Sequence, residues 1–214
     1  MRVTFEHQLE VLHTELIEMG ALCEQAIART FEVLMEGNQR AAEEIIKKDA
    51  VVDAKEREIE NLCLRLLLQQ QPVAGDLRKV SAALKMITDM ERIGDQAADI
   101  ADIVKIGALH APDESIRLGE MAKETAKMVS SSIDAYVKQD LKIAQNVIAS
   151  DDKVDALFDE VKEELVQGLR KGLTTDIQSM DYLMIAKYYE RIGDHATNIA
   201  EWVEFSITGR HKGE

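Results

Sequence analysis

The five-residue run Glu-Arg-Ile-Gly-Asp occurs twice in this chain, at residues 91–95 and again at residues 190–194. Each copy lies within a longer pattern in which apolar residues recur every three or four positions, and this pattern indicates an amphipathic helix. In both copies the glutamate and the aspartate fall within the apolar stripe. A carboxylate at such a place is costly unless a basic partner, a proton or a metal ion compensates it. The repeat therefore predicts two helices, each of which carries one of two related acidic sites.

The composition favours an all-α protein. Of the 214 residues, 46% are hydrophobic, 31% are charged and 4% are aromatic, and there are only 2 prolines. Helix breaks are predicted at Gln71-Pro72, at His110 to Pro112 and at three other places rich in polar residues or glycine. We expect helices over residues 4–36, 39–70, 75–107, 113–138, 141–171 and 176–208. Short connections between long helices imply antiparallel neighbours, and no sheet is expected.

The net charge, the two cysteines and the lack of a long apolar run restrict the classes of function that the chain can have. Lys and Arg number 26 against 40 Asp and Glu, which gives a net charge of −14 that repels phosphate backbones and anionic lipid alike. Nucleic acid is therefore not an expected partner. The two cysteines, Cys23 and Cys63, form no framework and suit the core of a protein in a reducing compartment. No apolar run approaches the roughly 20 residues that span a membrane, so we expect a cytoplasmic protein.

The chain also contains an internal repeat of about half its length. Asp49 and Asp53 align with Asp151 and Asp155 at a shift of 102 residues, and the repeated pentapeptide aligns at a shift of 99. A repeat this long exceeds the period of a solenoid and fits two related bundles. We expect two pseudo-symmetric antiparallel three-helix bundles packed together, the first over residues 1–110 and the second over residues 111–214.

Four of the predicted helices carry two acids four residues apart on an apolar stripe. These pairs are Asp49 with Asp53, Glu91 with Asp95, Asp151 with Asp155, and Glu190 with Asp194. Within each half the two pairs lie on consecutive antiparallel helices, so they are expected to converge. Four or more oxygen ligands without a His or Cys pair favour hard cations such as Mg²⁺, Mn²⁺, Ca²⁺ or Fe³⁺. Asp99 and Asn198 extend the two lines and favour a multinuclear cluster, although a mononuclear site stays open.

A simpler interpretation exists for each single pair, because acids at this spacing are common on solvated helix surfaces. Their repetition on four apolar stripes favours a metal site. His195 lies about 140° from Glu190 around the helix axis, so we expect an exposed residue or one behind the ligands, and we leave it out of the site.

The arginines and glycines of the pentapeptide have structural interpretations. Arg92 and Arg191 are expected to form interhelical salt bridges with neighbouring acids. Gly94 and Gly193 each cost about 1 kcal/mol inside a helix, so their recurrence indicates the close approach of another helix or of bound ions, of which helix packing is favoured.

Longer motifs resemble a known family. Residues 71–78 spell Gln-Pro-Val-Ala-Gly-Asp-Leu-Arg, and they are followed by Leu84-Lys85 and by Asp-Met-Glu-Arg-Ile-Gly-Asp at 89–95. This series resembles the signature of the PhoU family of phosphate-uptake regulators. Residues 190–201 are similar to the C-terminal motif of that family. The resemblance covers essentially the whole chain.

The resemblance implies two three-helix bundles with multinuclear metal clusters, iron or zinc, held by acids spaced four residues apart. Glu91, Asp95, Glu190 and Asp194 match the family motif outright; Asp49, Asp53, Asp151 and Asp155 match its partner; Asp99 and Asn198 match more weakly. At position 99 the family has Asn where this chain has Asp. The added charge leaves the number of ions in that cluster open.

The resemblance also implies a function. PhoU proteins act as cytoplasmic negative regulators of phosphate uptake and of phosphate-starvation signalling. Their partners are the phosphate ABC transporter, through its cytoplasmic subunits, and a sensor histidine kinase. The chain is therefore expected to be a non-enzymatic adaptor recruited to the inner face of the membrane through partners. We further expect a homodimer.

Proteins of other functional classes have a similar composition. A carboxylate-bridged metal oxidase or a metal-storage bundle also uses acidic helices, but ferritin-like sites carry Glu-x-x-His pairs. In this chain Gly94 and Gly193 stand three residues after Glu91 and Glu190. A hydrolase that uses metal ions on phosphate would need an open coordination position. Of these alternatives the adaptor is favoured.

Overall fold

The computed structural model describes residues 2–70, 74–107, 109, 111–114 and 116–210. Within them it has six α-helices and no strand. They are α1 (Arg2–Glu36), α2 (Gln39–Gln70), α3 (Ala74–Gly107), α4 (Leu118–Lys138), α5 (Leu141–Lys171) and α6 (Asp176–Thr208). The predicted all-α class is confirmed, while Gln71, Pro72, Val73 and His110, on which part of the motif and two of the breaks fall, lie outside the described residues.

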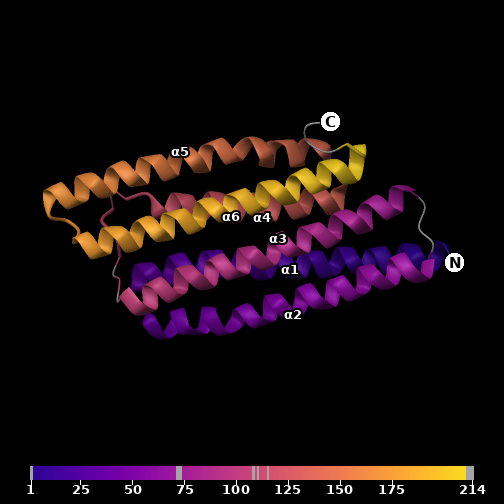
Figure 1. Ribbon diagram of the computed structural model, residues 1–214, viewed down its shortest axis with the longest axis horizontal. Helices are drawn as coiled ribbons and strands as arrows, with labels where there is room; N and C mark the ends of the chain where they lie inside the picture. The colour runs from indigo at the N-terminus through magenta and orange to yellow at the C-terminus, as the bar shows by residue number, and fades with distance from the viewer. Residues whose placement is uncertain (1, 71–73, 108, 110, 115, 211–214) are drawn as a thin grey trace.

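The helices lie side by side along the long axis of the molecule (Figure 1). Helices α1, α2 and α3 contact one another in the first half, and α4, α5 and α6 do so in the second. Between the halves, α3 packs against α6 and α1 packs against α4. In Figure 1, α3 and α6 therefore occupy the middle of the view, and α2 and α5 lie at the two edges. This is the expected arrangement of two three-helix bundles packed together.

The start of α4 differs from the prediction, which placed it at residue 113. The backbone N–H of Ile116 donates to the carbonyl of Asp113 at 2.9 Å and closes a turn instead. Glu164 of α5 then accepts from the backbone N–H of Arg117 at 3.0 Å and from its Nε at 2.7 Å. In a longer α4 the backbone N–H of Arg117 would donate within the helix. It donates to Glu164 instead, and the helix begins at Leu118.

The remaining breaks agree with the prediction because local caps end the helices. Asp140 caps α5 by accepting hydrogen bonds from the backbone N–H groups of residues 142 and 143. Thr175 and Gln178 form a reciprocal capping box at the start of α6. Gly172 ends α5 with φ of 70°, a left-handed conformation that suits glycine.

One core runs through both halves, and buried apolar side chains come from all six helices. The hydroxyls of Thr30 on α1 and Tyr189 on α6 hydrogen-bond at 2.9 Å within this core. Cys23 and Cys63 are buried and unpaired, as expected, and the Sγ of Cys23 donates to the carbonyl of Met90.

The glycines of the pentapeptide lie where two helices approach closely. A Cβ at Gly94 of α3 would come within 2.8 Å of the Oδ1 of Asp49 and 3.1 Å of the Cγ1 of Val52, both on α2. In the second half, a Cβ at Gly193 of α6 would come within 3.3 Å of the Cγ1 of Val154 on α5. The predicted close packing is therefore confirmed. It brings the acids on either side of each glycine against the facing helix.

Gly94→Ala is expected to lower the free energy of unfolding by about 1 to 3 kcal/mol, because the added methyl group must displace the Asp49 carboxylate and Val52. Gly75→Ala is the matched control on the same helix, since a Cβ there meets no atom within 4 Å. The control should leave stability unchanged or raise it by up to about 1 kcal/mol. Urea denaturation of both variants measures the difference, and equal stabilities would show that packing does not require the glycine.

Candidate metal centre

The predicted acids of the first half lie together between α2 and α3. Asp49 and Asp53 come from α2, and Glu91, Asp95 and Asp99 come from α3. We call these five residues the N-terminal acidic cluster. Burial raises the pKa of Asp49 to about 6, and the charges of all four other members add to that rise. Burial, followed by the charge of Asp95, also raises the pKa of Glu91. Like charges thus face one another across the two helices.

Asp49 is the most constrained member of this cluster. Its Oδ1 is buried against Gly94 and has no hydrogen-bond partner within the described chain. A buried carboxylate oxygen without a donor is costly, and a proton or a bound cation would relieve that cost. A cavity of about 520 Å³ between α1 and α2 extends to Asp49 and Gly94. Leu22, Ala26 and Ile45 form part of its apolar lining.

The second half repeats the arrangement between α5 and α6. Asp151 and Asp155 come from α5, and Glu190 and Asp194 come from α6. We call these four residues the C-terminal acidic cluster. Burial, followed by the charge of Asp155, raises the pKa of Asp151. Burial, followed by the charges of Glu190 and Asp151, raises the pKa of Asp194. The pseudo-symmetry predicted from the repeat therefore extends to the electrostatics.

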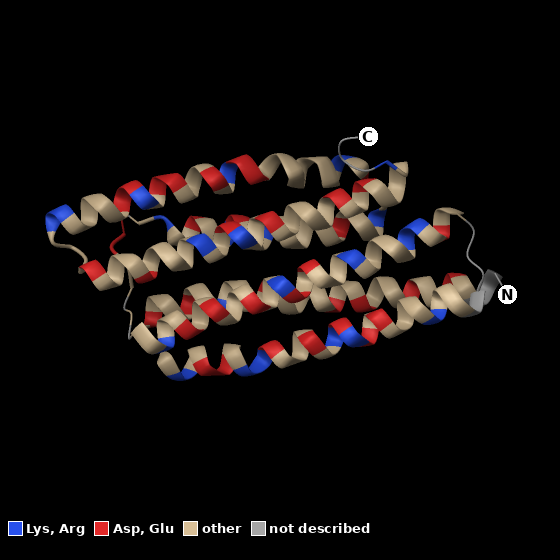
Figure 2. Cartoon of the chain, viewed as in Figure 1, with Lys and Arg blue, Asp and Glu red and all other residues tan. Residues whose placement is uncertain are grey.

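Basic side chains lie beside both clusters. Arg92 contacts Asp95 at 2.9 Å and Glu91 at 3.5 Å. The interhelical salt bridge expected for Arg92 is therefore wrong, because both of its partners lie on its own helix. Arg191 of α6 does act across helices, since its charge partly counters the rise in the pKa of Asp99 on α3. Figure 2 shows the overall charge pattern, with blue segments of ribbon (Lys and Arg) interspersed among red ones (Asp and Glu) along the helices.

Lys187 is the basic residue beside the C-terminal acidic cluster, as Arg92 is beside the N-terminal one. Its ammonium group forms an ion pair with Glu190, three residues further along α6. The same ammonium lies 5.5 Å from the ring centroid of Phe158 on α5. Each acidic cluster thus has a cation on one of its own helices that neutralises part of its charge.

The clusters have the oxygen donors that hard cations prefer, and the unpartnered oxygen of Asp49 fits such an ion. In the part of the chain that the structure describes, however, no three His, Cys, Asp or Glu side chains are arranged as ligands of one ion. The eight acids of the four pairs lie in their clusters. Asp99, the fifth member of the N-terminal acidic cluster, and Asn198 lie one turn further along α3 and α6, where each also meets residues of the opposite half. Metal ligation by the ten predicted residues stays a prediction.

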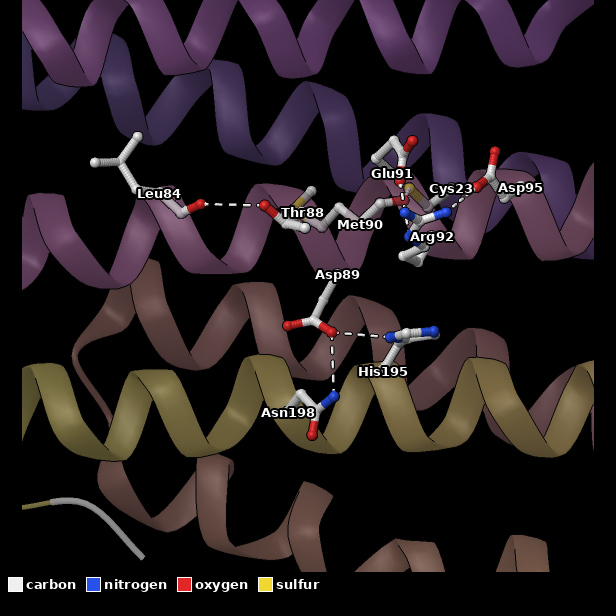
Figure 3. Close-up of polar contacts among 10 residues, drawn as sticks. All are labelled: Cys23, Leu84, Thr88, Asp89, Met90, Glu91, Arg92, Asp95, His195 and Asn198. Carbon is white, nitrogen blue, oxygen red and sulfur yellow. Dashed lines mark hydrogen bonds and ion pairs between the residues drawn. The ribbon is translucent and has the colours of Figure 1, made fainter.

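Asp89 is a residue that the sequence analysis did not single out. Its Oδ1 accepts a hydrogen bond from the Nδ2 of Asn198 at 3.1 Å and lies 2.8 Å from the Nδ1 of His195 (Figure 3). Asp89 belongs to α3, whereas its two partners belong to α6. The interaction therefore joins the two halves. No spacing within either helix could reveal it, because the partners are more than 100 residues apart.

The pKa of Asp49 predicts a pH dependence. The folded state binds this proton more tightly than the unfolded chain, in which the carboxyl has its ordinary pKa of 3.8, so stability is lost as pH rises from about 4 through about 6. In Asp49→Asn that loss should be smaller, and the variant should be more stable than the parent protein at pH 7. Urea denaturation across this range measures both effects.

The exposed residue Asp102, also on α3, provides the control for this prediction. Asp102→Asn should keep the pH dependence of the parent protein. A loss of stability in Asp49→Asn that is as steep as in the parent would contradict the role assigned to Asp49.

Comparison with known proteins agrees with this architecture. The PhoU domain model matches residues 16–104 and, a second time, residues 118–203. A phosphate-specific transport system accessory protein PhoU homolog from Clostridium acetobutylicum is 39% identical over 211 residues, which cover 98% of this chain and 96% of that protein. The corresponding PhoU protein of Serratia marcescens is 30% identical, with 98% of this chain and 88% of that protein covered.

Two solved structures share the fold over nearly the whole chain. PhoU from Pseudomonas aeruginosa has a TM-score of 0.87 and 28% identity, with 96% of this chain and 100% of that chain covered. The phosphate transport system regulatory protein PhoU from Streptococcus pneumoniae also has a TM-score of 0.87, with 27% identity and with 98% and 100% covered. Since both halves match the family model and the relatives match almost from end to end, the chain belongs to the PhoU family.

Proposed function

We propose that this protein is a negative regulator of phosphate uptake and of phosphate-starvation signalling. In this role it is a cytoplasmic adaptor between the cytoplasmic subunits of a phosphate ABC transporter and a sensor histidine kinase. The observation that supports it best is the nearly full-length match to accessory proteins of the phosphate-specific transport system. A homodimer is part of the same proposal.

The fold supports an adaptor because long, rigid helices offer extended faces to partner proteins. None of the described helices has a stretch apolar enough to cross a bilayer. Association with the transporter is therefore proposed to occur through protein contacts. The net charge of −14 disfavours binding to anionic lipid and supports the same route.

Metal ions are the second part of the proposal. The N-terminal acidic cluster would hold them in the first half, and the C-terminal acidic cluster together with Asn198 would do so in the second. Bound cations would neutralise the facing carboxylates and link α2 to α3 and α5 to α6. The family resemblance favours iron or zinc, whereas oxygen donors alone also suit Mg²⁺, Mn²⁺ or Ca²⁺. The alternative function, a carboxylate-bridged metalloenzyme or storage bundle, uses the same residues.

Glu91→Ala combined with Asp95→Ala is expected to remove metal from the first half and leave the second half loaded. The reason is that each cluster draws its ligands from its own half. Elemental analysis of protein purified without chelator or affinity tag gives the metal-to-protein ratio. The matched control, Glu190→Ala with Asp194→Ala, should have the opposite effect. An unchanged ratio in both double variants would refute these sites.

Deletion of the gene from its host should raise expression of phosphate-starvation genes at high phosphate. The loss of a brake between transporter and kinase is the expected cause. A reporter fused to a starvation-induced promoter measures the effect, and re-expression of the protein should restore repression. The purified, metal-loaded protein should not hydrolyse phosphoesters. Unchanged reporter output or hydrolysis at enzymic rates would favour the metalloenzyme alternative.

A further inference from the structure

An exposed apolar surface lies where the end of α3 meets the start of α6. Ile106 is 75% exposed on α3, and Ile177, Met180 and Met184 are 75%, 62% and 44% exposed on α6. The three α6 residues are spaced three and four positions apart, so they share one face of the helix. We call these four residues the apolar end patch. Exposed apolar side chains that lie together are typical of protein interaction sites.

The packing of the two helices brings the α3 and α6 parts of the patch together. A Cβ at Gly107 of α3 would lie 2.9 Å from the Oδ2 of Asp181 of α6, so the helices touch at this point. Ile106 precedes Gly107 in the sequence, and Met180 precedes Asp181. In Figure 1, α3 and α6 run antiparallel, and the end of α3 lies at the same end of the molecule as the start of α6.

The internal repeat indicates that the fold does not require apolar residues in this patch. At a shift of 99 residues, the three α6 positions correspond to three polar or charged residues of α3, Arg78, Ser81 and Lys85. The ammonium group of Lys85 lies 5.9 Å from the ring centroid of Trp202 on α6. The corresponding surface of the first half is therefore polar. The apolar side chains of the second half need an explanation other than the packing of the bundle.

The surroundings of the apolar end patch are acidic. In the two segments that carry it, residues 99–107 and 176–184, four acids accompany a single basic residue, Lys105. Two of these acids, Asp102 and Asp176, are exposed. A partner with Lys or Arg around an apolar face would therefore meet complementary charge, which favours correct encounters and disfavours acidic partners.

An amphipathic helix has the dimensions of this surface. From Ile177 to Met184 the patch extends about 10 Å along α6, which corresponds to two helical turns. A docked helix presents apolar residues over that length at positions i, i+3 or i+4, and i+7. Methionine side chains are flexible and fit different apolar faces, which suits an adaptor that has more than one partner.

Two other occupants fit the charges less well. A symmetric contact between two copies of the chain would place the same acids opposite one another, because each copy contributes the same patch. An anionic membrane would repel these acids and also the chain as a whole, with its net charge of −14. The acids around the patch thus favour a basic protein segment.

We propose that the apolar end patch is a docking surface for an amphipathic helix of a partner protein, whose apolar face is flanked by Lys and Arg. The inference rests on the proposed adaptor function and names the surface that this function uses. It involves neither the acidic clusters nor a bound metal ion. Because the patch combines a helix from each half, a partner helix docked there contacts both halves at once.

Met180→Gln combined with Met184→Gln tests this surface, because the change removes apolar groups and leaves the charge of the protein unaltered. The probes are the purified phosphate ABC transporter and the cytoplasmic part of the sensor kinase from the same host. Surface plasmon resonance should show that the double variant binds at least one probe roughly 10-fold or more weakly. Both substituted residues are exposed, so circular dichroism should show an unchanged melting temperature.

Leu64→Gln combined with Leu68→Gln is the matched control. These two leucines are also four residues apart and exposed, at 44% and 82%. They lie near the end of α2, which Figure 1 shows at the opposite end of the molecule from the apolar end patch. The control should bind both probes as the unmodified protein does. An equal loss of binding in the two double variants would overturn the inference, since any exposed apolar pair would then have the same effect.

A photoreactive side chain in the patch identifies the occupant directly. After irradiation with either probe, the Met180→benzoylphenylalanine variant should be cross-linked to a helix whose apolar face is flanked by Lys or Arg. Mass spectrometry of the cross-linked peptides identifies that helix. Cross-links only to a second copy of the chain, or only to lipid of added anionic vesicles, would overturn the inference.

The behaviour of the unmodified protein distinguishes failure of the docking surface from failure of the adaptor function. If the unmodified protein binds a probe and the variant with Met180→Gln and Met184→Gln binds it equally well, docking occurs elsewhere and only the assignment of the patch is wrong. If the unmodified protein binds neither probe, the adaptor function is wrong, and the docking surface with it.

Discussion

Both acidic clusters depend on a close approach of two helices, of α2 to α3 at Gly94 and of α5 to α6 at Gly193. A side chain at either glycine would press against a valine of the facing helix, Val52 or Val154. With hydrogen there, apolar residues such as Val52 and Val154 pack against the facing backbone and hold like charges together. Packing energy thus opposes electrostatic repulsion, which is a common way for proteins to maintain sites with perturbed pKa values.

Much of this architecture follows from local patterns. Apolar periodicity predicted all six helices, since each stripe is a property of consecutive residues. The start of α4 could not be predicted in the same way, because Glu164 holds Arg117 from 47 residues away. The partners of Arg92 were also predicted wrongly. Two arrangements of Arg92 fit the sequence: an ion pair with an acid three residues away on the same helix, and an ion pair with an acid on another helix. Only the structure distinguishes them.

The sequence likewise predicts only part of the candidate site. The repeat was enough to predict which acids gather in each half and that the halves are equivalent. The contacts of Asp89 with His195 and Asn198 depend on how α3 lies against α6, and nothing in the sequence of either helix indicates that register. His195 illustrates the limit. Its angle on the helix excluded it from the acid stripe, but its partner on another helix could be found only in three dimensions.

The packing of α3 against α6 and of α1 against α4 has a consequence for the origin of such chains. Each half buries apolar residues against the other half in a single continuous core. A chain of only one half would leave that face bare, and a second copy of the same half would fit it, because the repeat makes the two faces alike. The present molecule is in this sense a covalently joined dimer. A single chain also permits the two halves to differ, as they do where one has Asp99 and the other has Asn198.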